Sequence, residues 1–160
     1  VSFGLVPSVA MFCLWDVAPS SDLPSWMRYL TLTIVAFSAL RLAKFNIDDT
    51  QTTEFCGLPT PANGLFCLSL AMLMAAGSIS LPQWAILTIS IGMAYMLISP
   101  IRMFALKFKG FGWQGNEIRY SFIALCVVLI AAFTRYAVPA IILLYIIISA
   151  IRWAVNLNKK

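Results

Sequence analysis

Long apolar stretches separated by short polar segments dominate the chain. The stretch from Phe55 to Ile101 holds 47 residues without a charged side chain, and as one helix it would be about 70 Å long at 1.5 Å per residue. Because the hydrocarbon core of a bilayer is roughly 30 Å thick, this stretch is predicted to fold back on itself. Turn-forming residues collect at 77–83, between two predicted spans at about 61–80 and 83–101.

The rest of the chain follows the same pattern. A second apolar region is interrupted at Arg135 and Pro139, which predicts spans at about 118–134 and 138–155. A further span is predicted from Trp26 to Phe45. All spans are expected to be helical, because an isolated strand cannot satisfy its backbone hydrogen bonds in lipid.

The first apolar stretch, Val1 to Trp15, is short and is interpreted as the second half of a span. The chain begins with Val inside this stretch, without a positively charged leader, and is therefore interpreted as the remainder of a longer protein. The predicted fold class is all-α: a polytopic transmembrane helix bundle of five complete spans and one partial N-terminal span. It is expected to form a single membrane domain over residues 1–160.

Basic residues are distributed unevenly about the predicted spans. If the loops alternate sides, Arg28 and Arg135 share one side, and the other nine Lys and Arg residues share the opposite side. Basic residues concentrate on the cytoplasmic side of membrane proteins. The chain is therefore expected to be a multi-pass protein of the cell (inner) membrane with these nine residues in the cytoplasm: Arg41, Lys44, Arg102, Lys107, Lys109, Arg119, Arg152, Lys159 and Lys160.

Composition excludes several classes of protein. The chain is 61% hydrophobic, with a mean hydropathy of +0.90 and a net charge of +5. A soluble domain of this size leaves roughly a third of its unfolded surface exposed, so a cytosolic globular protein is excluded. The absence of His excludes a Ser-His-Asp triad and a His-based zinc site. The four cysteines form no C-x-x-C pair, so no disulfide framework or metal site is expected. No nucleic-acid partner is expected either.

One polar motif lies at the end of the 26–45 span. Arg41 and Lys44 are three residues apart and share a helical face, with Ser38 one turn earlier. Two interpretations remain open. The basic side chains could extend to the membrane interface and act only as topology signals, or they could form an anion site, because ionisable residues in membrane helices usually face a polar cavity.

A second polar motif leads into the 61–80 span. Pro59 and Pro61 flank Thr60 and hold the chain extended before a helix start, and Pro61 suits the first helical turn. This is a rigid helix entry. A free helix N-terminus facing a cytoplasmic cavity is also suited to bind phosphate or carboxylate.

Three segments together resemble a known family. Ser2-Phe3-Gly4, A-L-R-L-A-K-F-N at 39–46 and G-L-P-T-P-A-N at 57–63 are similar, in order and spacing, to the phosphatidylserine synthase branch of the CDP-alcohol phosphatidyltransferases. The resemblance covers nearly the whole chain, and the two central motifs are its most specific part. It implies CDP-diacylglycerol and L-serine as substrates, a divalent metal (Mg or Mn) as cofactor, membrane lipids as surroundings and a possible homodimer.

The chain departs from this family in one respect. The family signature D-x-x-D-G-x-x-A-R-x8-G-x3-D-x3-D, whose carboxylates hold the metal, is absent, and its last Asp is expected just before Val1. Two upstream helices are expected to be missing with it, so no catalytic residue is expected in this chain and the fragment alone is predicted to be inactive.

The resemblance implies that this chain supplies the acceptor site. Arg41 and Lys44 are assigned to neutralise the serine carboxylate or a phosphate, Asn46 to hydrogen-bond the acceptor, and Thr60 to close the pocket with the local backbone. The alternatives are a small polytopic transporter or channel subunit, and a scaffold protein without a ligand.

Several other signals carry less weight. Residues 110–115 match G-x-G-x-x-G, but a dinucleotide loop needs a βαβ unit around it. Asp48, Asp49 and Glu54 are interpreted as a solvated loop. Small residues four apart, Gly4 with Ser8 and Ala39 with Ala43, are expected to let helices approach closely.

Overall fold

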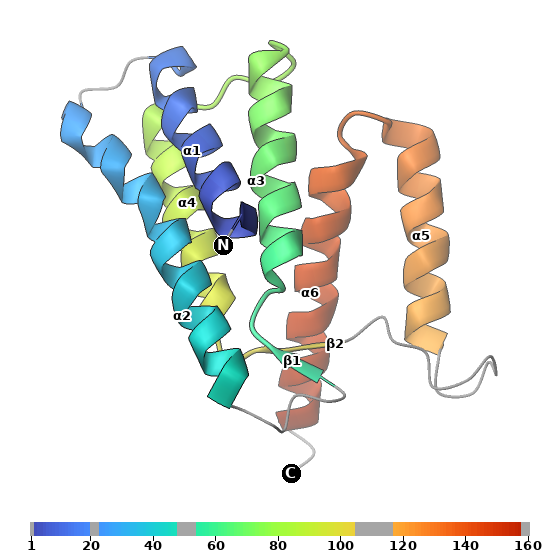
Figure 1. Ribbon diagram of the computed structural model, residues 1–160. Coiled ribbons are helices and arrows are strands. Elements are labelled where there is room, and N and C mark those ends of the chain that lie inside the picture. Colours follow the sequence, from blue (N-terminus) through green and yellow to red (C-terminus); the bar gives the residue numbers. More distant parts are fainter. Residues whose placement is uncertain (1, 20–22, 48–53, 105–116, 158–160) are drawn as a thin grey trace.

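The computed structural model is all-α, as the apolar pattern predicts, and describes residues 2–19, 23–47, 54–104 and 117–157 (Figure 1). Two three-residue strands, β1 (Glu54–Cys56) and β2 (Arg102–Phe104), accompany the helices. The helices are α1 (Ser2–Val17), the 3₁₀ helix η1 (Ser25–Leu32), α2 (Thr33–Ile47), α3 (Thr60–Ala75), α4 (Gln83–Ile98), α5 (Glu117–Phe133) and α6 (Ala137–Leu157).

The helix bounds differ most from the predicted spans at two places. The span predicted at 26–45 begins as the 3₁₀ helix η1 and continues directly as α2. The span predicted to reach residue 80 ends at Ala75, because Gly77 adopts a left-handed conformation with φ +67°. The Ser78 N–H donates to the Leu73 carbonyl and the Gly77 N–H to the Met74 carbonyl, both at 2.9 Å. This is a Schellman motif, which satisfies the last carbonyls of α3.

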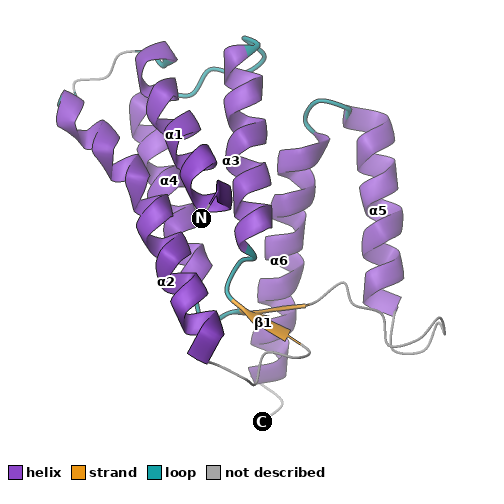
Figure 2. Cartoon of the chain, viewed as in Figure 1, coloured by secondary structure: helices purple, strands orange, loops and turns teal. Residues whose placement is uncertain are grey.

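Successive helices run in alternating directions, so the connections fall at two ends of the bundle (Figure 1). Figure 2 shows both strands at the end where α2, α4 and α6 finish and where α3 and α5 begin. Among the described basic residues, Arg28 and Arg135 belong to the opposite end, in η1 and in the α5–α6 turn. The described connections are thus grouped at two ends of the bundle as the alternation of loops predicts, and their placement on two sides of a membrane stays a prediction.

The core lies where the first four helices meet. Helix α1 packs against α2 and α3, and α2 also packs against α4. Each of these four helices contributes a fully buried residue to one apolar cluster: Met11, Ile34, Cys67 and Ile86. Helix α6 packs against α3, and α5 packs against α6 at the edge of the bundle (Figure 1).

The two strands pair antiparallel, with Phe55 opposite Met103 and Cys56 opposite Arg102. They join the α2–α3 connection to the α4–α5 connection. The sequence did not predict them, because three residues beside charged loops are too few to show a period of two. Glu54, interpreted from the sequence as part of a solvated loop, is instead the first residue of β1.

Helix length gives partial support for a membrane protein. Among the described helices, α6 is the one that is long and apolar enough to cross a bilayer by itself, with a mean hydropathy of 2.2 over Ala137–Val155. Helices α1, α3 and α4, and the segment Tyr120–Phe133, are apolar but have 10–17 residues. A membrane-crossing helix is thus present by length and composition, and the five-span bundle stays a prediction.

Candidate functional site

The site begins with the last turns of α2, which carry the first polar motif. Arg41 is half-buried, and Ser38, on the same face one turn earlier, is buried. Lys44 and Asn46 lie in the final turn of α2 and are exposed. The helix therefore presents one basic side chain toward the bundle and another toward its surroundings.

The loop that leads into α3 carries the second motif and is fixed by α4 and the segment after it. Gly57 has φ +75° and donates its N–H to the Ile101 carbonyl at 2.9 Å. Leu58 is fully buried and donates its N–H to the Met96 carbonyl at 2.8 Å. Helix α3 begins at Thr60 with Pro61 in its first turn, as the sequence predicts. These bonds hold Thr60 in place.

Arg41 connects the two motifs. Its Nη1 donates to Thr60 Oγ1 at 3.3 Å, and its Nη2 lies 3.5 Å from the Gly57 carbonyl oxygen. Both acceptor oxygens are uncharged, so they orient the guanidinium without neutralising its charge. The structure thus brings Arg41 and Thr60 together, whereas it describes no contact of Lys44 or Asn46 with either.

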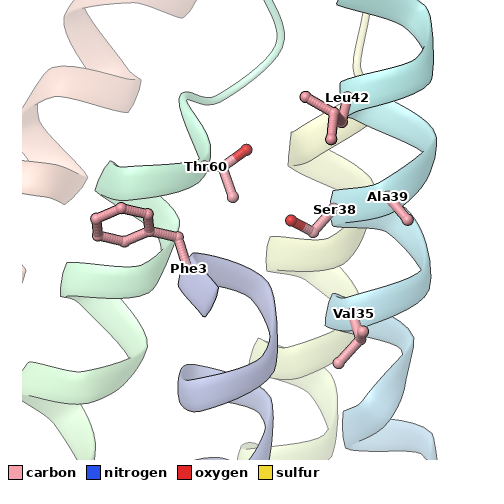
Figure 3. A pocket seen from close by; sticks show the side chains of 6 residues that line it. All are labelled: Phe3, Val35, Ser38, Ala39, Leu42 and Thr60. Atoms are coloured by element: carbon pink, nitrogen blue, oxygen red, sulfur yellow. The ribbon is translucent and has the colours of Figure 1, made fainter. Parts of the chain in front are cut away.

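Thr60 of this pair also lines a cavity of about 220 Å³, whereas Arg41 is not among the described lining residues. Figure 3 shows the hydroxyl-bearing side chains of Ser38 and Thr60 turned toward the space between α2 and α3, with Phe3 at its edge. The remaining lining residues are apolar: Val35, Ala39 and Leu42. The cavity is large enough for a small molecule, and two hydroxyl groups form the polar part of its described lining.

Two further residues, which the sequence patterns did not point to, have a weak electrostatic influence on Arg41: Tyr145 of α6 and Cys56 of β1. Tyr145 is buried and Cys56 is half-buried. A signal for Tyr145 does exist in the sequence, since it is a rare polar residue within the apolar stretch of the last helix.

The described residues do not form a metal site. No group of three or more His, Cys, Asp or Glu side chains gathers anywhere in the described parts of the chain. At the Arg41–Thr60 site the nearest groups are a cation, hydroxyls and a backbone carbonyl, a set that does not suit Mg²⁺ or Mn²⁺, which prefer carboxylate oxygens. Asp48, Asp49 and the glycine-rich segment 110–115 lie outside the described residues.

No protein-family model matches the chain, and no curated protein matches it in sequence.

Proposed function

We propose that the chain is the membrane-embedded acceptor half of a CDP-alcohol phosphatidyltransferase that transfers a phosphatidyl group from CDP-diacylglycerol to L-serine. The proposal rests on the resemblance of the 39–46 and 57–63 motifs to that family. The observation that carries it further is the contact between Arg41 Nη1 and Thr60 Oγ1 at 3.3 Å, which joins one residue from each motif in a single site.

The chemistry proposed for this site is recognition of the acceptor's carboxylate. The guanidinium of Arg41 offers a planar set of N–H donors that matches a carboxylate. The N-terminus of α3, at Thr60, adds the positive end of a helix dipole. The acceptor is proposed to occupy the cavity of about 220 Å³ that Ser38 and Thr60 line.

In the proposed reaction the serine hydroxyl oxygen forms a bond to the phosphorus that carries diacylglycerol. The bond from that phosphorus to CMP breaks, CMP leaves, and the hydroxyl proton is released. Phosphoryl transfer depends mainly on positioning and on neutralising charge. The role proposed for this chain is to position the acceptor, and the resemblance assigns the metal-holding carboxylates to a motif ahead of the matched residues.

The site is proposed to lie at the cytoplasmic surface of a multi-pass bundle in the cell membrane. Exposed large apolar side chains occur on all six α-helices, for example Val9, Leu40, Met72, Ile91, Val128 and Ile147. Monomeric soluble proteins rarely expose so extensive an apolar surface, whereas lipid covers it in a membrane. The polar residues of the site gather at one end of the bundle, where a lipid substrate can meet a water-soluble one.

The test is release of CMP by protein expressed from the complete reading frame, supplied with CDP-diacylglycerol, serine and Mg²⁺ or Mn²⁺. We expect serine-dependent release. Arg41→Gln is expected to raise the KM for serine about ten- to hundredfold, because a hydrogen bond to a charged group contributes about 1.5–3 kcal/mol.

The matched control is Arg135→Gln, which removes an exposed cation in the α5–α6 turn and should leave the KM for serine unchanged. Absence of CMP release by the complete protein would overturn the proposed function. An unchanged KM for serine in Arg41→Gln would show that the acceptor site is wrongly assigned. Residues 1–160 alone are expected to be inactive, and turnover by them would place the metal ligands within this chain.

A further inference from the structure

Ser38 of α2 places a buried hydroxyl in the cavity that it lines with Thr60. Its residue is 7% exposed, and Figure 3 shows the side-chain oxygen turned into the cavity. Within the described part of the chain, the Ser38 hydroxyl forms no hydrogen bond. A buried hydroxyl without a partner is unfavourable until another molecule supplies one. The partner of Ser38 must therefore come from a molecule that enters the cavity.

Two other serines of the apolar helices bond to their own helix instead. Ser69 of α3 donates to the Phe66 carbonyl at 2.8 Å. Ser90 of α4 donates to the Ile86 carbonyl at the same distance. This backward bond is a common way for a serine within a helix to satisfy its hydroxyl. Ser38 also lies within a helix, but its hydroxyl is turned toward α3 (Figure 3), so it is available to a ligand.

The second hydroxyl of the cavity has its orientation set by Arg41. Thr60 Oγ1 accepts an N–H of Arg41 at 3.3 Å, so the O–H of Thr60 points away from the guanidinium. A hydroxyl has one donor and two lone pairs, and a bond accepted from a cation strengthens the bond that the hydroxyl donates. Thr60 therefore offers a donor to an oxygen of the ligand, whereas Ser38 is free to donate or to accept.

We propose that Ser38 is an acceptor-binding residue whose hydroxyl hydrogen-bonds the acceptor, an inference that rests on the proposed function. The other side chains of the described lining are apolar: Phe3, Val35, Ala39 and Leu42. An acceptor held at Thr60 therefore has Ser38 as its other polar side-chain contact in the described lining. Because the apolar walls cannot replace that bond, the Ser38 hydroxyl favours a small polar acceptor over an apolar molecule of the same size.

The first test measures stability without any activity. Thermal unfolding of the complete protein in detergent, without substrates, is compared for Ser38→Ala and Ser8→Ala. Ser8 of α1 is the matched control: it is buried, its hydroxyl has no partner in the described part of the chain, and it is not among the described lining residues of the cavity. We expect neither substitution to lower Tm, because neither removes a hydrogen bond within the protein. A fall in Tm for Ser38→Ala alone would show that its hydroxyl is bonded within the protein and would overturn the proposal.

The second test uses CMP release with serine as the varied substrate. We expect Ser38→Ala to raise the KM for serine about three- to tenfold, the effect of one lost hydrogen bond, with the KM for CDP-diacylglycerol unchanged. Ser38→Cys keeps nearly the same shape but has a weaker hydrogen-bonding group, so it should also raise the KM for serine. Ser8→Ala should leave both KM values unchanged.

The outcomes separate the two proposals. If the unaltered protein releases CMP but Ser38→Ala leaves the KM for serine unchanged, water alone pairs with the hydroxyl and the acceptor-binding role is overturned while the transferase stands. A KM for serine in Ser38→Cys equal to that of the unaltered protein would assign the effect to shape and overturn the role as well, as would an equal rise in Ser8→Ala. Absence of CMP release by the unaltered protein would overturn the transferase and the acceptor-binding role with it.

Discussion

Gly4 of α1 lies directly against Ser38 of α2. A Cβ atom on residue 4 would come within 2.6 Å of both the Cβ and the Oγ of Ser38, which is closer than side-chain atoms pack. Both residues are buried, and Ser38 also lines the cavity of about 220 Å³. The missing side chain at Gly4 therefore sets the separation of α1 and α2 at the candidate site.

Gly4→Ala is expected to destabilise the protein by about 1–3 kcal/mol, the usual cost of overpacking. The measurement is the midpoint of thermal or denaturant unfolding in detergent. Gly92→Ala is the control, because a Cβ on this glycine of α4 meets nothing within 4 Å. Removing a helical glycine there should stabilise by about 0.5–1 kcal/mol. Equal effects of the two substitutions would contradict a close contact at Gly4.

Gly57 and Gly77 both have positive φ but differ in their surroundings. A Cβ on Gly57 would lie 2.4 Å from the Leu97 carbonyl oxygen, whereas one on Gly77 meets nothing within 4 Å. Gly77→Ala should cost about 1–2 kcal/mol for the left-handed conformation alone. Gly57→Ala should cost more and should also raise the KM for serine, because the Gly57 carbonyl faces Arg41. A smaller loss of stability for Gly57→Ala than for Gly77→Ala would argue against the backbone contact.

Thr60 offers a direct test of the bond from Arg41. Thr60→Val keeps the shape and removes the acceptor, so it should destabilise the protein by about 1–2 kcal/mol and weaken serine binding. Thr60→Ser keeps the hydroxyl and is expected to retain most of the stability and most of the serine binding. Unfolding midpoints and the KM for serine provide the measurements. If Thr60→Val and Thr60→Ser change the unfolding midpoint and the KM for serine equally, the Thr60 hydroxyl does not hold Arg41.

Arg28 stabilises the opposite end of the bundle through aromatic contacts. Its guanidinium carbon lies 4.9 Å from the Phe12 ring centroid and 5.5 Å from that of Tyr29, whereas its ion pair with Asp16 is 3.6 Å long and largely exposed. Cation–π contacts contribute about 0.5–1 kcal/mol each at such sites, and exposed ion pairs contribute little. Arg28→Gln should therefore cost about 1–2 kcal/mol in unfolding experiments, and Asp16→Asn under about 0.5 kcal/mol. Equal losses of unfolding free energy in Arg28→Gln and Asp16→Asn would assign the stabilisation to the ion pair.

The proposed membrane orientation can be tested with single cysteines in a protein whose native cysteines are replaced by Ala. Asn46 and Arg135 are both exposed and belong to opposite ends of the bundle. A membrane-impermeant maleimide should label Arg135→Cys in intact cells and label Asn46→Cys only after the membrane is opened. Labelling of both variants in intact cells would contradict the orientation inferred from the basic residues.

The sequence predicted the helices because apolar runs and turn formers are local signals. Pro61 marks the observed start of α3, whereas the span predicted to reach residue 80 ends at Ala75, ahead of Gly77. Small residues four apart were a weaker guide. Gly4 does lie in a close helix contact, but Ala39 and Ala43 are exposed. Spacing along one helix does not tell which face a neighbouring helix covers.

The candidate site was predictable only in part. Arg41 and Thr60 were singled out within their motifs, and the structure joins them. The bonds from Gly57 and Leu58 to the α4 end depend on contacts between residues far apart in the chain. No local period or charge pattern encodes such contacts, so they needed the three-dimensional arrangement.

The pairing of β1 with β2 also fixes the order in which the site is assembled during synthesis. Phe104 pairs with Glu54 and leaves the ribosome only after α3 and α4 have been made. The bonds that hold the Gly57–Thr60 loop need the Met96 and Ile101 carbonyls, so a nascent chain that ends before α4 presents Arg41 without a fixed partner. The geometry that joins Arg41 to Thr60 is therefore a late product of translation, and a growing chain acquires it only after the scaffold around it has formed.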